Sequence, residues 1–490
     1  EIEENSELNS IKEGSLQNWV KKFERILKKE YGYKNLDIKF TGREIDFQDL
    51  KNNMDENQNI KFEFIKILST EERLKKLESV FKKIQDGPYE ELKTPEILGN
   101  FRKVFEQEFE IAVVATMSSG KSTLLNSFLG KNLIPSKNQA CTAKITRIED
   151  DKSINFFSAE IYDQEDKLIK KYEKIDAEDL KTFNDGENIG LIKLKGNVRN
   201  ISSNQSRLVL IDTPGPNNSM DIKHKELTYN LLKKDYKPLV LYILSYTQLG
   251  VDDDRDLLKN ISEEMNKGDL QSTERFIFVL NKFDARFEDD NDDDINKVLG
   301  KVKEYLEGLS IKNPIIIPTA ARTALFMRLN EDSLNNKSVK QRNTYKENIV
   351  DEYRDNEFNI NNLINISNTI KKSINFKIEK YSEENDDEKL AELLTGVPAL
   401  ENYIEDYLEK YSVPEKIVKS LESFKIFLDK EKFLDKINEM LTKNENLLKN
   451  MKDNIDTLNH RTKEIFPQIK TQMEKKVAEM NCTHNLGHKI

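Results

Sequence analysis

The sequence is poor in cysteine, tryptophan and long apolar runs. It has two cysteines, Cys141 and Cys482, and one tryptophan among 490 residues. Two cysteines cannot build a disulfide framework, which fits a reducing compartment. The longest apolar run, PLVLYILSY at 238–246, is far shorter than the roughly 20 residues of a membrane-spanning helix. Any membrane contact is therefore expected to be peripheral, or made by a segment outside this chain.

Positive charge is also in deficit. The chain has 78 Lys and Arg against 88 Asp and Glu, a net charge of −10, which argues against a nucleic-acid binder that works by bulk charge. Charged residues reach 34%, yet 24 Phe and 16 Tyr remain, so disorder throughout is not expected. The N-terminal EIEENSELNS has no signal-peptide pattern. We expect a cytoplasmic protein, or one peripheral on the inner face of the membrane.

Hydrophobic spacing divides the chain into helical arms and a central α/β region. Residues 8–110 are predicted to be helical because apolar side chains recur at helical spacing, from Leu8 to Leu27 and from Leu74 to Ile84. The chain then changes to short β-branched runs separated by helical stretches, as in a largely parallel sheet. The predicted strands are 109–115, 207–212, 239–244, 275–281 and 314–319.

Two later segments are distinguished by composition and by period. Residues 331–392 are rich in Asn, Asp, Glu and Lys, which predicts a polar insertion of solvated helix and loop. Between Leu434 and Leu458 the spacing alternates 3 and 4 in an unbroken heptad pattern that contains Asn444. That pattern fits core packing within a helical bundle, or a coiled coil between molecules.

A phosphate-binding loop follows the first predicted strand. The string ATMSSGKS at 115–122 has the Walker A spacing, with Ala115 in place of the first glycine. Backbone amides of such a loop and the N-terminus of the next helix face phosphate oxygens. Lys121 would reach the β- and γ-phosphates, and Ser122 would bind Mg²⁺. The nucleotide-binding residues expected here are Ser119, Gly120, Lys121, Ser122 and Thr123.

The alanine at position 115 departs from the motif. If the backbone there needs a positive φ, alanine is strained; if not, the change is harmless. The loop alone leaves ATP and GTP as alternatives.

Later motifs favour GTP. IDTPG at 211–215 puts Asp212 at a strand end, suited to Mg²⁺, and offers the Gly215 amide to the γ-phosphate. LNKFD at 280–284 has the N-K-x-D pattern: Asp284 can accept two hydrogen bonds from guanine, which adenine cannot offer. Asn281 and the stem of Lys282 would brace the base.

Two further segments complete the expected site. Thr142, in the string CTA, is a candidate switch threonine for Mg²⁺, which gives Ser122, Thr142 and Asp212 as the expected metal ligands. In PTAAR at 318–322 a backbone amide near Thr319 and Ala320 could meet guanine O6. Each motif is short and occurs by chance, but their order and their positions at strand ends predict one guanine-nucleotide site.

As a set, SSGKST, IDTPGP, SYTQL and LNKFD resemble the dynamin superfamily of large GTPases, specifically bacterial dynamin-like proteins. IDTPGPNN, YTQL and NKFD followed by an acidic stretch at 289–294 are similar to the subgroup that contains the replication-fork clamp-binding dynamin-like protein. The resemblance covers roughly 100–411 and closes with TGVPALENYIEDYL at 395–408 as a last helix of the GTPase domain.

The resemblance implies the catalytic roles. Ser118 would contact the bridging oxygen in place of an external arginine finger, Lys121 would hold the phosphates, and Thr142 would hold the lytic water. The sequence departs from the superfamily at two places. Met117 stands where many eukaryotic members have Gln, and segment 135–141 lacks their glycine-rich loop. The resemblance therefore does not support a monovalent-cation site or strong dimer-stimulated turnover.

The expected architecture is an α/β P-loop GTPase domain with a mostly parallel sheet, flanked by an α-helical neck or trunk bundle. Its segments are 1–100 (helical), 101–411 (GTPase domain) and 412–490 (helical). The expected function is Mg²⁺-dependent GTP hydrolysis coupled to membrane remodelling or tethering. The alternative is a regulatory GTP-binding protein in DNA replication or segregation, or a self-assembling scaffold. Expected partners are GTP and GDP, a second copy of the chain, membrane lipid, and a partner dynamin-like or replication protein.

Overall fold

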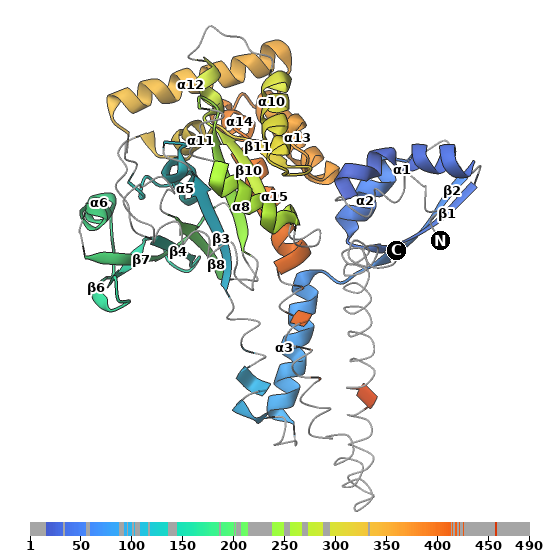
Figure 1. Ribbon diagram of the computed structural model, residues 1–490, viewed down its shortest axis with the longest axis horizontal. Coiled ribbons are helices and arrows are strands. Elements are labelled where there is room, and N and C mark those ends of the chain that lie inside the picture. The colour runs from blue at the N-terminus through green and yellow to red at the C-terminus, as the bar shows by residue number, and fades with distance from the viewer. Residues whose placement is uncertain are drawn as a thin grey trace, which may run out of the picture. The chain divides into compact units, whose positions relative to one another are not determined.

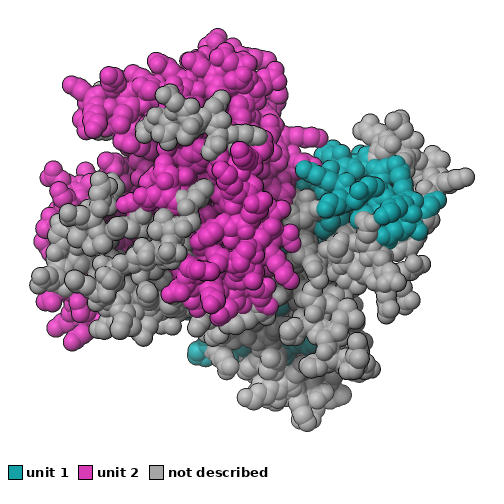
Figure 2. Space-filling view, turned by 45° about the horizontal axis from the view of Figure 1, so that its top comes forward, with its two compact units in different colours: residues 1–107, 204–206, 407–490 teal, residues 108–203, 207–406 magenta. Residues whose placement is uncertain are grey.

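The structure is a computed structural model that divides into two compact units (Figure 2). Unit 1 comprises residues 1–107, 204–206 and 407–490, and unit 2 comprises 108–203 and 207–406. None of the helices in the described ranges is long and apolar enough to span a bilayer. The described residues are 16–32, 35–54, 59–87, 93–95, 97–99, 102, 108–115, 118–135, 145–185, 188–199, 201, 207–213, 238–248, 255–266, 273–287, 295–331, 334–412, 414, 417, 418, 421, 425, 456 and 457.

Unit 1 contains a parallel strand pair as well as helices. Its elements are α1 (Leu16–Tyr31), β1 (Asn35–Gly42), α2 (Glu44–Asn52), β2 (Asn59–Lys66), α3 (Thr70–Asp86) and a π-helical turn (Leu408–Ser412). The prediction of helices across 8–110 is therefore confirmed for α1 and α3 and wrong for β1 and β2, where Ile38 pairs with Phe62. Apolar residues alternate with polar ones in both strands, and this period of two places one apolar face against Ile26 and Leu27 of α1.

Helix α3 begins and ends where its local sequence dictates. The Ser69 side chain accepts a hydrogen bond from the Glu72 amide at 3.2 Å, and the Glu72 carboxylate accepts one from the Ser69 amide at 2.7 Å. This reciprocal capping box satisfies two amides at the helix N-terminus. Gly87 follows the last helical residue. The neck or trunk role predicted for 1–100 and 412–490 stays a prediction, and most of the 434–458 pattern lies outside the described residues.

Unit 2 is built on a nine-stranded sheet (Figure 1). Its order is β11-β10-β9-β3-β8-β4-β7-β5-β6, and the five strands from β11 to β8 are mutually parallel. All five strands predicted from the sequence are confirmed, as β3, β8, β9, β10 and β11. The strands are β3 (Glu108–Ala115), β4 (Ile145–Asp150), β5 (Ser158–Asp163), β6 (Leu168–Tyr172), β7 (Ile189–Gly196), β8 (Arg207–Asp212), β9 (Leu239–Ser245), β10 (Phe276–Asn281) and β11 (Ile315–Pro318).

Strands β4 to β7 were not apparent in the sequence. Charged residues interrupt their apolar pattern, and β6 is exposed along most of its length. Their pairing comes from contacts distant in sequence: β4 is antiparallel to β8, and Arg147 on β4 forms ion pairs with Glu108 and Glu110 of β3 at 2.6 and 2.7 Å. Local hydrophobic periodicity therefore predicts too few strands for a sheet whose outer strands are half exposed to solvent.

Helices cover the parallel part of the sheet. Helices α8 and α10 pack on one face, where Tyr242 and Phe278 lie fully buried with ring centroids 5.9 Å apart. Helix α15 confirms the last helix predicted at 395–408. The helices are α5 (Lys121–Leu129), α6 (Ala177–Asp185), α8 (Arg255–Asn266), α10 (Ile295–Gly308), α11 (Ala321–Arg328), α12 (Asn336–Asn356), α13 (Asn368–Glu383), α14 (Asp387–Leu394) and α15 (Val397–Tyr407), with 3₁₀ turns η4 (Phe283–Phe287) and η6 (Ile360–Leu363).

The polar region 331–392 forms helices α12 to α14. Its surface is largely charged, but it also buries apolar side chains such as Tyr345, Ile349, Ile374 and Leu390. It is thus a packed part of unit 2 rather than only a solvated insertion. The parallel strands β3, β8, β9, β10 and β11 all end at one edge of the sheet, and ligands of such folds bind at that edge.

Candidate nucleotide-binding site

The phosphate loop leads from β3 into α5. Ala115 is buried at the end of β3 and is not among the residues with positive φ, so alanine there is unstrained. Positive φ occurs instead at Ser118 (64°) and at Gly120 (92°), the N-cap of α5. A side chain at Gly120 would collide with the amide of Asn281. Glycine at position 120 is thus required by its conformation and by this close approach.

Lys121 already faces the acid predicted to bind metal. Its ammonium lies 2.8 Å from Asp212 Oδ1 at the end of β8 and donates to the carbonyl of Thr213. Both charged side chains are about 16% exposed. The structure therefore brings together the loop lysine and the strand-end carboxylate, and the phosphates of a nucleotide would compete for the same ammonium.

The oxygen donors of this region suit Mg²⁺. Ser122 is the second residue of α5, and Asp212 pairs with the lysine that precedes it. A serine hydroxyl and one carboxylate are hard ligands, and Mg²⁺ commonly takes its remaining ligands from phosphate and water. Among the described residues no group of three or more His, Cys, Asp or Glu could hold a metal ion. Bound by Ser122 and Asp212, Mg²⁺ would neutralise charge on the phosphate oxygens.

Asn281 connects the phosphate loop to the loop after β11. Its side-chain amide donates to the Ser119 carbonyl at 3.0 Å, and its oxygen accepts from Thr319 Oγ1 at 3.3 Å and from the Ala321 amide at 3.2 Å. Asn281 is 2% exposed. Through these contacts Asn281 joins the phosphate loop to the loop after β11, and the brace on the base stays a prediction.

The Asp284 carboxylate is held in place by Thr323 of α11. Thr323 Oγ1 donates to Asp284 Oδ2 at 2.7 Å, and both residues are buried. Burial raises the pKa of Asp284, while the hydrogen bond from Thr323 opposes that rise. Donors from a guanine edge would also favour the ionised carboxylate. The sequence did not single out Thr323, because its role depends on α11 meeting η4.

Lys282, two residues before Asp284, has a positive φ of 64°. Burial lowers the pKa of its half-buried ammonium, and the nearby Asp284 carboxylate opposes that change. The stem of the side chain is the part expected to lie against the base, and this role stays a prediction.

The amides proposed to read guanine O6 have partners within the protein. The Thr319 amide donates to the Leu280 carbonyl at 2.8 Å, and the Ala320 amide donates to the Thr395 carbonyl at 2.8 Å. The Ala321 amide is bonded to Asn281, so the amides of Thr319, Ala320 and Ala321 all have partners in the observed conformation. A contact between the Ala320 amide and O6 would require this amide to exchange the Thr395 carbonyl for the base.

Helix α12 packs near Asp284. Arg286 on η4 forms an ion pair with Glu352 of α12, with one N–O distance of 2.7 Å, and its guanidinium lies 4.7 Å from the ring centroid of Phe358. Asp284 lines one small pocket together with Ile349 and Glu352 of α12 and with Phe358, so part of the polar region 331–392 lies beside it. Thr142 and Gly215 lie outside the described residues, so the predicted switch region is not part of this geometry.

Replacing Thr323 with valine is expected to reduce guanine selectivity. The change removes the donor to Asp284 while leaving a similar volume, and one hydrogen bond to a charged group contributes about 1.5 kcal/mol, or about tenfold in affinity. The measurement is the ratio of GTP to ITP dissociation constants, since inosine lacks the 2-amino group. Thr323→Ser, which keeps the hydroxyl, serves as the control. An unchanged ratio in Thr323→Val would show that Thr323 does not orient Asp284.

The fold is that of a P-loop GTPase domain with a mostly parallel sheet. Residues 111–283, less than half of the chain, match the model of the Dynamin family. No curated protein matches the sequence significantly.

Among solved structures, a chain from an oligomerised bacterial dynamin pair, described as a mechanism for the long-range sensing and tethering of membranes, has a TM-score of 0.47 at 16% identity; the match covers 83% of this chain and 64% of that one. A second chain described in the same way has a TM-score of 0.40 at 17% identity, covering 79% and 53%. LeoA, a bacterial dynamin GTPase from ETEC, has a TM-score of 0.35 at 14% identity, covering 81% and 54%. The match thus spans between about half and two thirds of those chains.

Proposed function

We propose that this protein is a Mg²⁺-dependent GTP-hydrolysing enzyme of the dynamin-like kind. The observation that carries the proposal is the meeting of two halves of a site at one sheet edge. The phosphate half is Lys121 paired with Asp212, and the guanine half is Asp284 held by Thr323. Asn281 connects the two halves through the Ser119 and Ala321 backbones. The match of 111–283 to the Dynamin family supports this assignment.

We infer the roles in hydrolysis from the motifs and from the resemblance to the dynamin superfamily. Lys121 and the α5 N-terminus would bind the phosphates, and Ser122 with Asp212 would hold Mg²⁺. Ser118, whose backbone has the left-handed conformation, would contact the bridging oxygen. Thr142 would complete the metal site and hold the lytic water, and the Gly215 amide would sense the γ-phosphate. Contacts of GTP with Thr142 and Gly215 would make self-association of the GTPase domains depend on the nucleotide.

We further propose that GTP turnover is coupled to membrane tethering or remodelling through the segments 1–100 and 412–490. The solved bacterial dynamin pair is described as sensing and tethering membranes, which motivates this step. The alternative is a regulatory GTP-binding role in DNA replication or segregation, as the resemblance to the replication-fork subgroup suggests, or a scaffold that assembles without remodelling. A second copy, membrane lipid and a replication protein are the corresponding partners, and the location would be the cytoplasm or the inner membrane face.

One experiment tests the proposal and separates its alternatives. The GTP hydrolysis rate per molecule is measured with rising protein concentration, with and without liposomes that contain anionic lipid. A specific activity that rises with concentration would indicate that two GTPase domains pair during catalysis. We expect liposomes to co-sediment with the protein in a GTP-sensitive manner.

The outcomes are distinct. No GTP hydrolysis at any concentration, with Mg²⁺ present, would rule out the enzymatic proposal. Hydrolysis without liposome binding would favour the regulatory role. A specific activity that does not depend on concentration would show that catalysis needs no second copy.

A further inference from the structure

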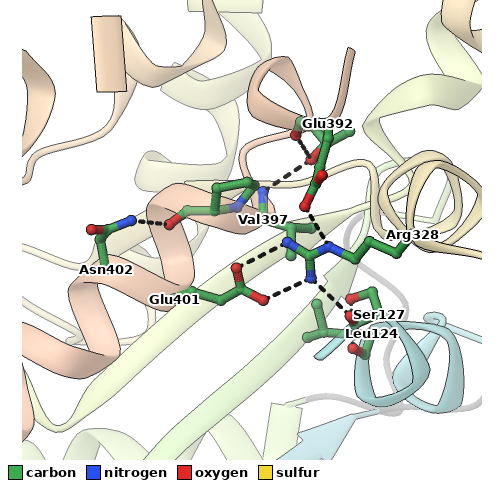
Figure 3. Close-up of polar contacts among 9 residues, drawn as sticks. Leu124, Ser127, Arg328, Glu392, Val397, Glu401 and Asn402 are labelled. Carbon is green, nitrogen blue, oxygen red and sulfur yellow. Dashed lines mark hydrogen bonds and ion pairs between the residues drawn. The ribbon is translucent and has the colours of Figure 1, made fainter. Parts of the chain in front are cut away.

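A buried arginine joins the end of α11 to three other helices of unit 2 (Figure 3). Arg328 donates from Nε to Glu392 of α14 at 2.7 Å, and from Nη1 and Nη2 to the two carboxylate oxygens of Glu401 on α15 at 2.7 and 2.9 Å. Its Nη1 also donates to the Ser127 carbonyl of α5 at 2.7 Å. The Arg328 side chain is only 6% exposed and Glu401 only 5%.

The chemistry of this group makes its geometry specific. A guanidinium has a planar fork of five N–H donors, and here that fork serves a bidentate carboxylate, a second carboxylate and a backbone carbonyl. Burial raises the pKa of Glu401 to about 7, and the nearby Arg328 opposes that rise. A buried ion pair of this kind is weak evidence for added stability but fixes the relative positions of the elements that it joins.

The first connection leads to the phosphate half of the site. Ser127 lies near the C-terminal end of α5, and Lys121 and Ser122 lie at its N-terminal end. Helix α5 has nine residues and is about 13 Å long, and its backbone hydrogen bonds connect these two ends. A shift of the Ser127 carbonyl would therefore change where the phosphate-binding end lies.

The second connection leads to the guanine half. Glu392 and Glu401 lie on either side of the turn between α14 and α15. In that turn the Thr395 carbonyl accepts the Ala320 amide at 2.8 Å. Gly396, with φ of 75°, lies so close to the Pro318 carbonyl that a side chain would collide with it. By holding both helices, Arg328 fixes the turn that contacts the loop after β11.

We propose that Arg328 is a positioning residue that couples the α14–α15 turn to both halves of the nucleotide site. The inference rests on the proposed function, because it assumes that GTP binds between α5 and the loop after β11. It adds a consequence for α15: the arrangement of residues 392–404 and the affinity for nucleotide depend on each other. Thermodynamic linkage requires that this coupling act in both directions.

The test compares wild-type protein with Arg328→Lys and Glu401→Gln. Lysine keeps the charge but cannot bind Glu401 in a bidentate manner while reaching Ser127 and Glu392. Glutamine keeps the shape of Glu401 and removes its charge. Two quantities are measured: the dissociation constants of GTP and GDP, and amide hydrogen exchange of residues 392–404 with and without nucleotide.

Arg342→Lys is the matched control. Arg342 is also 5% exposed and binds two acids, Glu388 on α14 at 2.7 Å and Glu331 at 3.5 Å. In the described part of the chain it forms no bond to α5 or to the turn at Thr395. Arg342→Lys therefore shows how the loss of a buried guanidinium affects stability when the nucleotide site is not contacted.

We expect nucleotide to slow exchange at 392–404 in the wild type and in Arg342→Lys. In Arg328→Lys that response should be lost and the dissociation constants should rise roughly tenfold, within the range typical of coupled sites. In Glu401→Gln the dissociation constants should also rise and the exchange response at 392–404 should also weaken. Retention of both the affinity and the exchange response by Arg328→Lys would overturn the inference, as would a wild type that binds GTP without any response at 392–404. A wild type that binds no nucleotide would instead overturn the proposed function, and this coupling with it.

Discussion

Lys121→Ala is expected to lower the affinity for GTP and GDP by more than about 100-fold. A charged hydrogen bond to phosphate contributes about 3 kcal/mol, which corresponds to about two powers of ten. The change also leaves Asp212, now 2.8 Å from the Lys121 ammonium, without its partner and next to the incoming phosphates. Repulsion between these like charges adds to the loss. The measurement is equilibrium binding of a fluorescent GTP analogue, together with the loss of GTP hydrolysis.

Lys131→Ala provides the control for Lys121→Ala. Lys131 follows the opposite end of α5, where its ammonium donates to the Asn155 carbonyl at 2.8 Å. Its loss removes the same charge from the same neighbourhood of the chain without touching the phosphate loop. We expect wild-type affinity for Lys131→Ala. Undiminished GTP binding by Lys121→Ala would show that nucleotide does not bind at this loop.

Asp284→Asn is expected to change the preferred base from guanine to xanthine. Guanine donates from N1 and N2 to the carboxylate, and an asparagine in its place can accept from N1 but presents a donor to the 2-amino group. Losing one charged hydrogen bond and creating a donor–donor clash should reduce GTP affinity by about 100-fold. Xanthine has an oxygen at that position, so the asparagine amide can donate to it and XTP affinity should rise. Competition binding with GTP, XTP and ITP measures this change in base preference.

The control for Asp284→Asn is a second buried carboxylate remote in sequence from the motifs. Asp49 on α2 is 1% exposed, and Asp49→Asn removes one buried charge in the same way. We expect Asp49→Asn to alter stability without changing base preference. Equal affinity for GTP and XTP in the wild type, or unchanged selectivity in Asp284→Asn, would mean that Asp284 does not read the base.

The parallel strands and the motif residues were accessible from sequence because their signals are local. Strands β3, β9 and β10 are buried along almost their whole length, and β8 and β11 are short, mainly apolar runs, of which β11 is half buried. A polar motif at the end of such a run must lie at the carboxyl edge. The pairing of Lys121 with Asp212 follows from that rule, since β3 and β8 are adjacent and parallel.

Other parts of the fold depend on contacts that sequence spacing does not report. The strands β1 and β2 were read as helix because helical spacing on either side of them dominated the pattern. Strands β4 to β7 carry charged faces, and their place follows from partners distant in sequence. Thr323 and Arg328 have no distinguishing local pattern: each lies on α11, and each acquires its role only when that helix meets η4, α5, α14 and α15.

By itself the sequence determined the α/β P-loop class, the parallel strands and the residues of the phosphate and guanine motifs. The reason is that apolar strand runs and loop motifs are each recognisable within a few consecutive residues. Only the tertiary structure decided which backbone amides are already bonded, what holds Asp284 and how α15 is joined to α5. Those features are distances between atoms far apart in the chain, and burial makes their charges and hydrogen bonds depend on the packing of every helix around them.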